Sequence, residues 1–307
     1  MAITVPSQTV ATNSGDGTDF SVTVPSDVSG GILAGDWIVV IALHCESEDN
    51  TWGLPSWADA EWLAELQVGQ SPPSVPGVQV FAELCAGGES GTRASTDGTF
   101  AGGWNVICFV VRGVDGTTPL DVTVTTAQST ATGEPDPPSI TPTNDNCLIL
   151  AIGGQDDTGA GSGGTQTNYT QLGFVNNNQS TGGNLYASYR ILSGGGGSPE
   201  DPPAWNSSNN DEWCGATIAL RPGTPYEISG VTRDAAGDPL GSCDVYLVKD
   251  QGSDVFAYVD YQLSNASTGA FTFTTPDNDP NYQIIAFKDG SPNLMDCTEW
   301  TITPATP

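Results

Sequence analysis

Short apolar runs alternate with clusters of Gly, Pro, Asn and Ser along the whole chain of 307 residues. Runs of this length, bounded by turn residues, are typical of β-strands, and helical periodicity is almost absent. The sequence therefore predicts an all-β protein. The runs that we expect to form strands are Asp19 to Val24, Trp37 to His44, Trp62 to Leu66, Val78 to Cys85, Val106 to Arg112, Leu120 to Thr125, Cys147 to Ile152, Thr170 to Val175, Leu185 to Leu192 and Thr217 to Arg221.

Two segments that contain such runs each have a similar counterpart later in the chain, and the distance to the counterpart is the same for both. AGDWIVVIAL, from Ala34, aligns without a gap on TNDNCLILAI, from Thr143, and WNVICFVVRG, from Trp104, aligns on WCGATIALRPG, from Trp213. Both pairs of starting residues are 109 positions apart. This period is far above that of solenoid repeats, so it predicts one structure built from two similar halves.

Each half contains four or five expected strands, too few to bury both faces of a sheet by itself. Two halves that face each other solve this problem. We therefore expect a jelly-roll-like β-sandwich over residues 1–222, with two tandem immunoglobulin-like sandwiches as the alternative. Asp36 recurs as Asp145 and Arg112 as Arg221, so these residues are expected to belong to the scaffold.

A boundary follows at Pro222-Gly223-Thr224-Pro225, which cannot continue a central strand. Residues 223–225 are read as a short linker and residues 226–307 as a second domain. There, Phe271 and Phe273 alternate with Thr, and Gly237-Asp238-Pro239 is a turn between two strands. The second domain is thus predicted to be a smaller β-sandwich.

Two resemblances agree with this division. The succession GDWIVVIAL, Trp62-Leu63, VQVFAEL, VICFVVRGVDGTTPLDV and ATIALRPG resembles jelly-roll modules of tailed-phage virion proteins. The second domain resembles the transthyretin-like, Ig-like fold of carboxypeptidase regulatory-like domains, which implies an accessory, adhesion or spacing module without catalysis. The residues that match this pattern are Gly230, Asp234, Gly237, Pro239, Leu240, Val245, Leu247, Gly269, Phe271, Phe273, Tyr282, Ile284 and Ala286.

The charge is strongly one-signed: Lys and Arg number 7 against 36 Asp and Glu, a formal net charge of -29. Such an acidic surface repels phosphate, so nucleic acid is not an expected partner. No basic segment followed by an apolar run opens the chain, and no apolar run is long enough for a membrane helix. We expect synthesis in a host cytoplasm without a signal peptide, and no membrane partner.

Catalytic chemistry has few candidates. His44 is the only histidine, which excludes sites that need two imidazoles, and it ends an apolar strand with no nucleophile elbow in the chain. We interpret it as a structural residue, with a catalytic base as the alternative. Acidic residues near aromatic ones, such as Glu61 and Glu83, would need the separation of a glycosidase pair, which spacing along the chain does not give. The protein is expected not to be an enzyme.

Three tryptophans, Trp52, Trp57 and Trp62, recur every five residues in a segment rich in Pro and Gly. Such a group can form a stacking platform for sugar rings or contact a partner protein. The alternative is that Trp62 belongs to the core and the other two cover an open edge of the sandwich. Trp52 and Trp57 are therefore the candidate glycan or partner contacts.

No cofactor is expected, although acidic clusters at residues 46–50, 155–157 and 277–279 offer the oxygen ligands that a structural Ca²⁺ prefers. Solvated turns are the alternative. Cysteines within apolar runs, such as Cys108, are read as buried thiols. Cys243 and Cys297 could form a disulfide in the second domain.

Together these observations predict a non-enzymatic structural protein of a phage virion, decorating or cementing the capsid or otherwise exposed on the head surface. Its expected partners are other virion proteins, namely the major capsid protein or tail proteins, and further copies of itself on the particle. The alternative is a tail-fibre or receptor-binding protein that recognises a host surface glycan. A polysaccharide-cleaving enzyme is a third reading.

Overall fold

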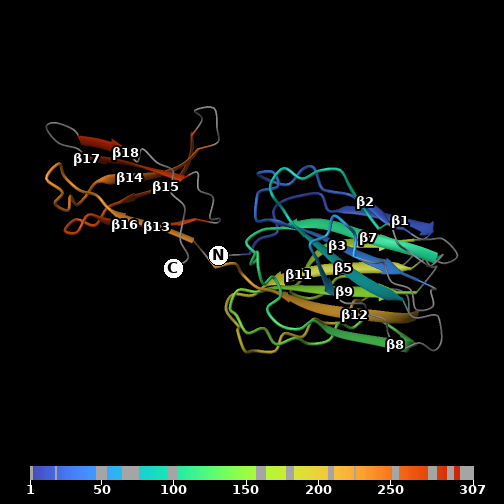
Figure 1. The fold of residues 1–307 in the computed structure, drawn as a ribbon. Helices are drawn as coiled ribbons and strands as arrows, with labels where there is room; N and C mark the ends of the chain where they lie inside the picture. The colour runs from blue at the N-terminus through green and yellow to red at the C-terminus, as the bar shows by residue number, and fades with distance from the viewer. Residues whose placement is uncertain are drawn as a thin grey trace. The chain divides into compact units, whose positions relative to one another are not determined.

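The computed structural model describes residues 3–17, 19–45, 54–63, 76–95, 102–156, 164–177, 183–206, 211–224, 226–250, 256–275, 282–288 and 294–297. The chain divides into two compact units, Met1–Gly223 and Thr224–Pro307. Each unit is built of antiparallel strands, and the described residues contain no helix (Figure 1). The expected all-β class and the sandwich architecture are confirmed.

Unit 1 contains two five-stranded sheets and a small two-stranded one. The first sheet has the order β1 (Ala11–Gly17), β7 (Gly102–Val111), β3 (Trp37–His44), β5 (Gly77–Leu84), β4 (Ala60–Leu63). The second has the order β8 (Thr125–Gly133), β12 (Asp211–Leu220), β9 (Leu148–Gln155), β11 (Asn184–Ile191), β10 (Thr170–Asn176). The small sheet pairs β2 (Ser21–Thr23) with β6 (Thr92–Ala94).

The two large sheets have the same connectivity. When the five strands of each large sheet are numbered in chain order, both sheets have the order first, fifth, second, fourth, third from one edge to the other. Each half of the sequence duplication therefore supplies one complete sheet, and no strand of either large sheet comes from the other half within the described residues. In a jelly roll both sheets take strands from both halves of the chain, so the sandwich of unit 1 has two similar sheets and not the connectivity of the expected jelly roll.

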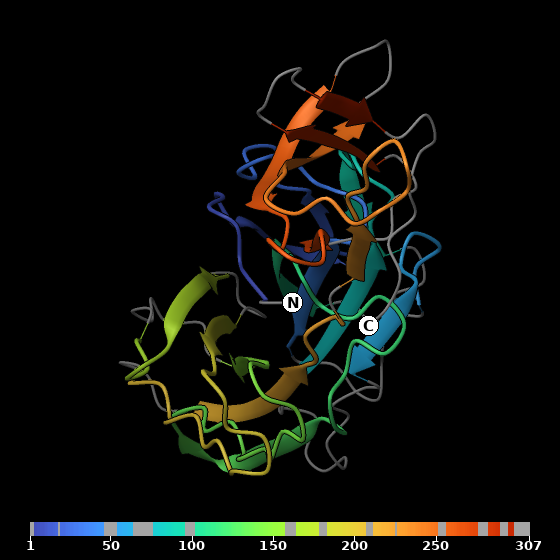
Figure 2. The ribbon, with the colours of Figure 1, turned by 90° about the vertical axis from the view of Figure 1, so that its left-hand side faces the viewer.

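The main core lies between the two sheets, which form separate layers (Figure 2). Val39 and Ile41 of β3 belong to the same buried cluster as Leu150 and Ile152 of β9. The outer face of the first sheet is covered by a second cluster that includes Phe20 from the segment leading into β2. Smaller clusters cover the outer face of the second sheet.

Burial on both faces explains why β3 and β9 carry no polar residue before their last one, His44 or Gln155, since every residue of each strand is buried. Close approach of the two sheets depends on glycine. A Cβ added to Gly154 of β9 would lie 2.4 Å from Leu43 Cδ1 and 2.8 Å from Cys214 Sγ. Only hydrogen fits at this position without displacing a core side chain.

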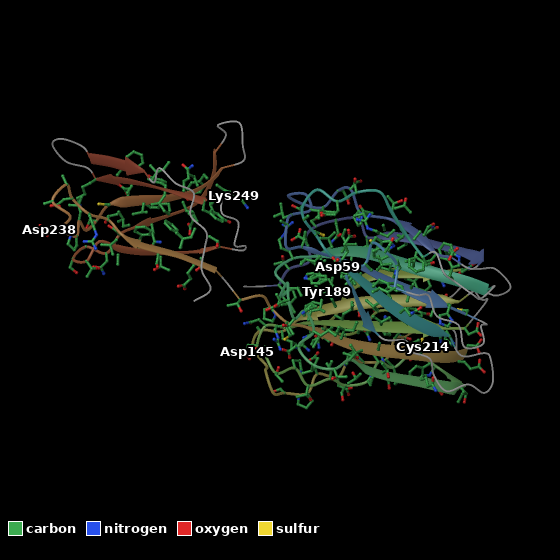
Figure 3. The ribbon with its side chains drawn as sticks, viewed as in Figure 1. Asp59, Asp145, Tyr189, Cys214, Asp238 and Lys249 are labelled. Carbon is green, nitrogen blue, oxygen red and sulfur yellow. The ribbon has the colours of Figure 1, made fainter. Side chains whose placement is uncertain are left out.

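The acidic and basic residues repeated between the halves form different contacts. In the first half, the buried Asp36 accepts hydrogen bonds from Arg112 Nε at 2.8 Å and Arg112 Nη2 at 2.7 Å. In the second half, Arg221 Nε lies 3.6 Å from Asp121 instead. Asp145, labelled in Figure 3, accepts the N–H of Gly196 and forms no ion pair with Arg221 among the described contacts. The repeated acidic and basic positions therefore pair with each other in the first half, whereas in the second half the arginine pairs with Asp121, which is not the repeated aspartate.

Unit 2 consists of a four-stranded and a two-stranded sheet among its described residues. The larger has the order β15 (Phe256–Leu263), β14 (Asp244–Asp250), β17 (Tyr282–Lys288), β18 (Leu294–Cys297), and the smaller pairs β13 (Tyr226–Val231) with β16 (Ala270–Thr275). Residues from both sheets, including Ile228, Leu247 and Phe273, form its core. Gly230 pairs with Phe271, whose ring would lie 2.5 Å from a Cβ at position 230.

Candidate functional site

The candidate contact residue Trp57 lies at the outer face of the first sheet, in a turn closed by a hydrogen bond from Ala58 N to Pro55 O. Its indole Nε1–H donates to Ala94 O in β6 at 2.8 Å. The ring meets Phe81 edge to face at a centroid distance of 6.1 Å. Trp57 therefore joins the turn before β4 to both β5 and β6.

Arg93 holds the indole from another side, with its guanidinium carbon 6.0 Å from the ring centroid. The guanidinium is itself fixed, because Nε and Nη2 donate to the two carboxylate oxygens of Glu83 at 2.6 and 3.0 Å, and Nη1 donates to Ser90 O. Such a two-pronged pair is geometrically specific. We call Trp57, Phe81, Glu83 and Arg93 the Trp57 cluster.

A glycan-stacking platform needs accessible ring faces and a polar handle. In the Trp57 cluster, the indole N–H is already bonded and the ring is half-buried against Phe81 and Arg93. This geometry fits the covering role that we gave as the alternative. Trp52 lies outside the described residues, as does the side chain of Trp62, so contact with a glycan or partner through Trp52 stays a prediction.

His44 is buried at the end of β3, with its cross-strand partner Gly77 beneath the imidazole. A Cβ at position 77 would lie 2.1 Å from His44 Nε2, so the ring occupies the space that a side chain there would need. Burial lowers the pKa of His44 to about 4. The imidazole is thus neutral and enclosed, which favours the structural interpretation over a catalytic base.

The described thiols are placed as core residues rather than nucleophiles. Burial raises the pKa of Cys108, Cys147 and Cys214 to about 12, so their reactive thiolate forms are scarce at neutral pH. The suggested disulfide between Cys243 and Cys297 is wrong, because Cys243 is a free, buried thiol whose Sγ–H donates to Leu240 O at 3.3 Å.

Of the suggested calcium clusters, only Gln155 and Asp156 lie within the described residues. Gln155, in one acidic cluster, is occupied by hydrogen bonds from Tyr186 Oη and to Gly133 O. Residues 46–50, 157 and 277–279 lie outside the described part of the chain, so a calcium ion at these clusters stays a suggestion. Within the described part, no group of three or more His, Cys, Asp or Glu side chains is arranged to hold a metal ion.

Sequence reasoning missed one surface, the outward face of the four-stranded sheet in unit 2. Tyr258, Tyr261, Leu263 and Phe287 are all exposed there, although they are large and apolar or aromatic. A contiguous apolar patch of this kind is a common mark of an interaction site. The signal in the sequence was the aromatic content of FAYVDYQL, which contains Phe256, Tyr258 and Tyr261.

Comparison with known proteins adds little. No protein-family model matches the chain, and no curated protein matches it. A solved structure, the crystal structure of trypsin-activated alpha-2-macroglobulin from Escherichia coli, aligns at 13% identity with a TM-score of 0.16. The alignment covers 97% of this chain but only 24% of that one, and so low a TM-score supports no inference. The described residues form no apolar helix of membrane-spanning length.

Proposed function

We propose that this protein is a non-enzymatic structural component of a tailed-phage virion that decorates or cements the capsid surface. The observation that carries the proposal is the construction of unit 1, where both large sheets are covered on both faces. His44 and the described cysteines lie inside that construction or in the unit 2 core. A scaffold that encloses these groups is suited to binding and display.

Charge supports the same role. A net charge of -29 keeps a protein soluble at high local concentration and opposes contact with packaged nucleic acid. The partners under this proposal are the major capsid protein or tail proteins and other copies of the chain. The protein would be made in the host cytoplasm and reside on the virion surface.

Purified particles test the proposal directly. The expected result is stoichiometric copies of the chain in virions purified through a density gradient, with immunogold label on the head surface. Absence of the chain from such virions would overturn the proposal. Label confined to the tail would replace capsid decoration by a tail role.

The glycan-binding alternative is tested separately at the Trp57 cluster. Because the indole packs on Phe81 and Arg93, Trp57→Ala is expected to lower the unfolding temperature while leaving glycan-array signals unchanged. Loss of a reproducible glycan signal in a folded Trp57→Ala protein would instead favour receptor binding.

A further inference from the structure

The outward face of the four-stranded sheet in unit 2 gathers aromatic and aliphatic side chains from three neighbouring strands. We call it the aromatic face and define it by Tyr246, Tyr258, Tyr261, Leu263, Ile285 and Phe287. Cross-strand partners lie on the same side of a sheet. Tyr246 pairs with Tyr261 and Ile285, so these three side chains lie on one side of the sheet. The buried Val245 and Leu247, the neighbours of Tyr246 in β14, lie on the other side.

A β-bulge enlarges this face. In a regular strand, Tyr258 and Tyr261 would point to opposite sides, because they are three residues apart. The register of β14 and β15 shifts between Leu247 and Val248, so that Tyr258 pairs with Val248 and Tyr261 with Tyr246. Both tyrosines therefore lie on the outward side, where Tyr258 is 66% exposed and Leu263 is 58% exposed.

The ring geometry argues against a flat sugar as the occupant. Tyr246 and Tyr261 are 5.0 Å apart with their planes at 41°, and Tyr246 and Phe287 are 5.6 Å apart at 85°. The rings pack against one another at steep angles, so they do not present the coplanar surface on which pyranose rings stack. An irregular protein surface fits such a face better.

The surrounding charge is negative. Residues 224–307 contain twelve Asp and Glu but only three Lys and Arg. All three cations are engaged elsewhere: Arg233 Nη1 donates to Gly237 O, Lys249 lies over the Tyr282 ring, and Lys288 Nζ donates to Gly241 O and Ser242 O. Asp238, in the loop that Arg233 contacts, and Lys249 lie at opposite ends of this unit (Figure 3).

One carboxylate reaches the aromatic face itself. Tyr261 Oη donates to Asp244 Oδ1 at 2.7 Å, and Asp244 pairs with both Leu263 and Phe287 on the outward side. A second copy of the same face would bring like charges together, which costs binding free energy. Basic residues beside an apolar patch would complement it.

We propose that the aromatic face of unit 2 is a docking site for a partner protein whose contact surface is aliphatic and bordered by Lys or Arg. Among the described strands β15 forms an edge of this sheet, but its bulge disfavours the docking of an extended segment there, because a bulge disrupts edge pairing. The site is independent of the virion proposal, because its chemistry is the same whatever particle or surface contains the protein.

Three peptides serve as probes of the full chain: one alternating Leu and Lys, one alternating Leu and Glu, and one alternating Ser and Lys. We expect the Leu–Lys peptide to bind and to shift the amide resonances of β14, β15 and β17. The double variant Tyr258→Ser, Leu263→Ser should bind it about tenfold more weakly. Leu54→Ser, which removes a similarly exposed leucine from unit 1, should bind as the wild type does.

A second variant separates charge from apolar contact. Asp244→Asn keeps an acceptor for Tyr261 and the whole apolar surface, and it should weaken the Leu–Lys peptide severalfold without changing the circular dichroism spectrum. Equal binding of the Leu–Lys and Ser–Lys peptides, or undiminished binding by a folded double variant, would overturn the proposal. Preference for the Leu–Glu peptide would do the same. Self-association that the double variant abolishes would identify a second copy as the occupant instead.

Discussion

At the scale of single residues, the enclosed His44 makes the stability of the protein depend on pH. His44 is neutral in the folded protein, where its pKa is about 4, but binds a proton near its ordinary pKa of 6.5 when the chain unfolds. Between these values the unfolded state carries more protons, so stability falls as the pH is lowered. Above pH 6.5 the stabilising effect is fully present.

We predict that acidification from pH 6.5 to pH 4 removes about 3 kcal/mol of unfolding free energy through His44. Denaturant titrations at several pH values measure it. The loss between pH 6.5 and 5 should be absent in His44→Asn, since the chain has no other histidine. The same slope in both proteins would show that other groups are responsible.

A second residue-scale prediction concerns the contact between the sheets. Gly154→Ala places a Cβ 2.4 Å from Leu43 and should destabilise unit 1 by about 1–3 kcal/mol through overpacking. Gly116→Ala is the matched control, because its Cβ would lie 3.9 Å from Leu84 in ordinary contact. Denaturant unfolding compares the two, and equal effects would contradict the tight packing at Gly154.

At the scale of elements, the duplicated halves are similar in strand order but differ in their ion pairs. Asp36 is buried and bonded through both carboxylate oxygens to Arg112, whereas Asp121 accepts backbone N–H groups from Thr143 and Asn144 and lies farther from Arg221. Although burial alone would raise it, hydrogen bonds from Asn144 and Thr143 hold the pKa of Asp121 below its ordinary value.

We therefore predict unequal effects of two equivalent substitutions. Arg112→Met leaves the Asp36 carboxylate buried without its cation and should cost about 2–3 kcal/mol. Arg221→Met should cost less than about 1 kcal/mol, because Asp121 keeps its backbone donors. Thermal and denaturant unfolding of both variants measure the difference, and equal losses would mean that the two arginines have the same role.

Strands with an apolar pattern could be predicted from the sequence, and those without one could not. Trp37–His44 has the predicted bounds, and the runs at Val78 and Leu185 are within one residue of β5 and β11. The polar strands β1 and β8 were missed, since each is an edge strand held by backbone bonds to one neighbour. In place of the strand expected at 120–125, Leu120 forms an isolated bridge and β8 begins at Thr125.

The pairing registers of the strands could not be predicted from the sequence either. Trp104 pairs opposite His44 and Trp213 opposite Gln155, so the equivalent positions on β3 and β9 are 111 residues apart rather than 109. A shift of two residues keeps every side chain on its face, so the apolar pattern cannot reveal it.

Only part of the Trp57 cluster could be predicted from the sequence. The spacing of the tryptophans indicated Trp57, but its contacts with Phe81 and Arg93 depend on strands that are distant in the sequence. The bulge that enlarges the aromatic face left no comparable pattern.

At the scale of the whole molecule, each unit has a hydrophobic core of its own among the described residues. Phe273 is fully buried in unit 2, so Phe273→Ala should destabilise that unit by about 3–5 kcal/mol and leave unit 1 unchanged. Calorimetry of the full chain should show two transitions, of which the variant lowers one. A single transition that moves as a whole would mean that the units unfold together.

The segregation of the two large sheets by half also matters while the protein is being made. A ribosome completes the first sheet at Val111, before any strand of the second sheet has emerged. At about 5–20 residues per second, the partner half follows over roughly 5–20 s. During that interval Val39, Ile41 and Leu43 form an apolar surface with nothing to cover it. The newborn chain is thus most vulnerable to aggregation about halfway through the synthesis of unit 1, when a chaperone would be of most use.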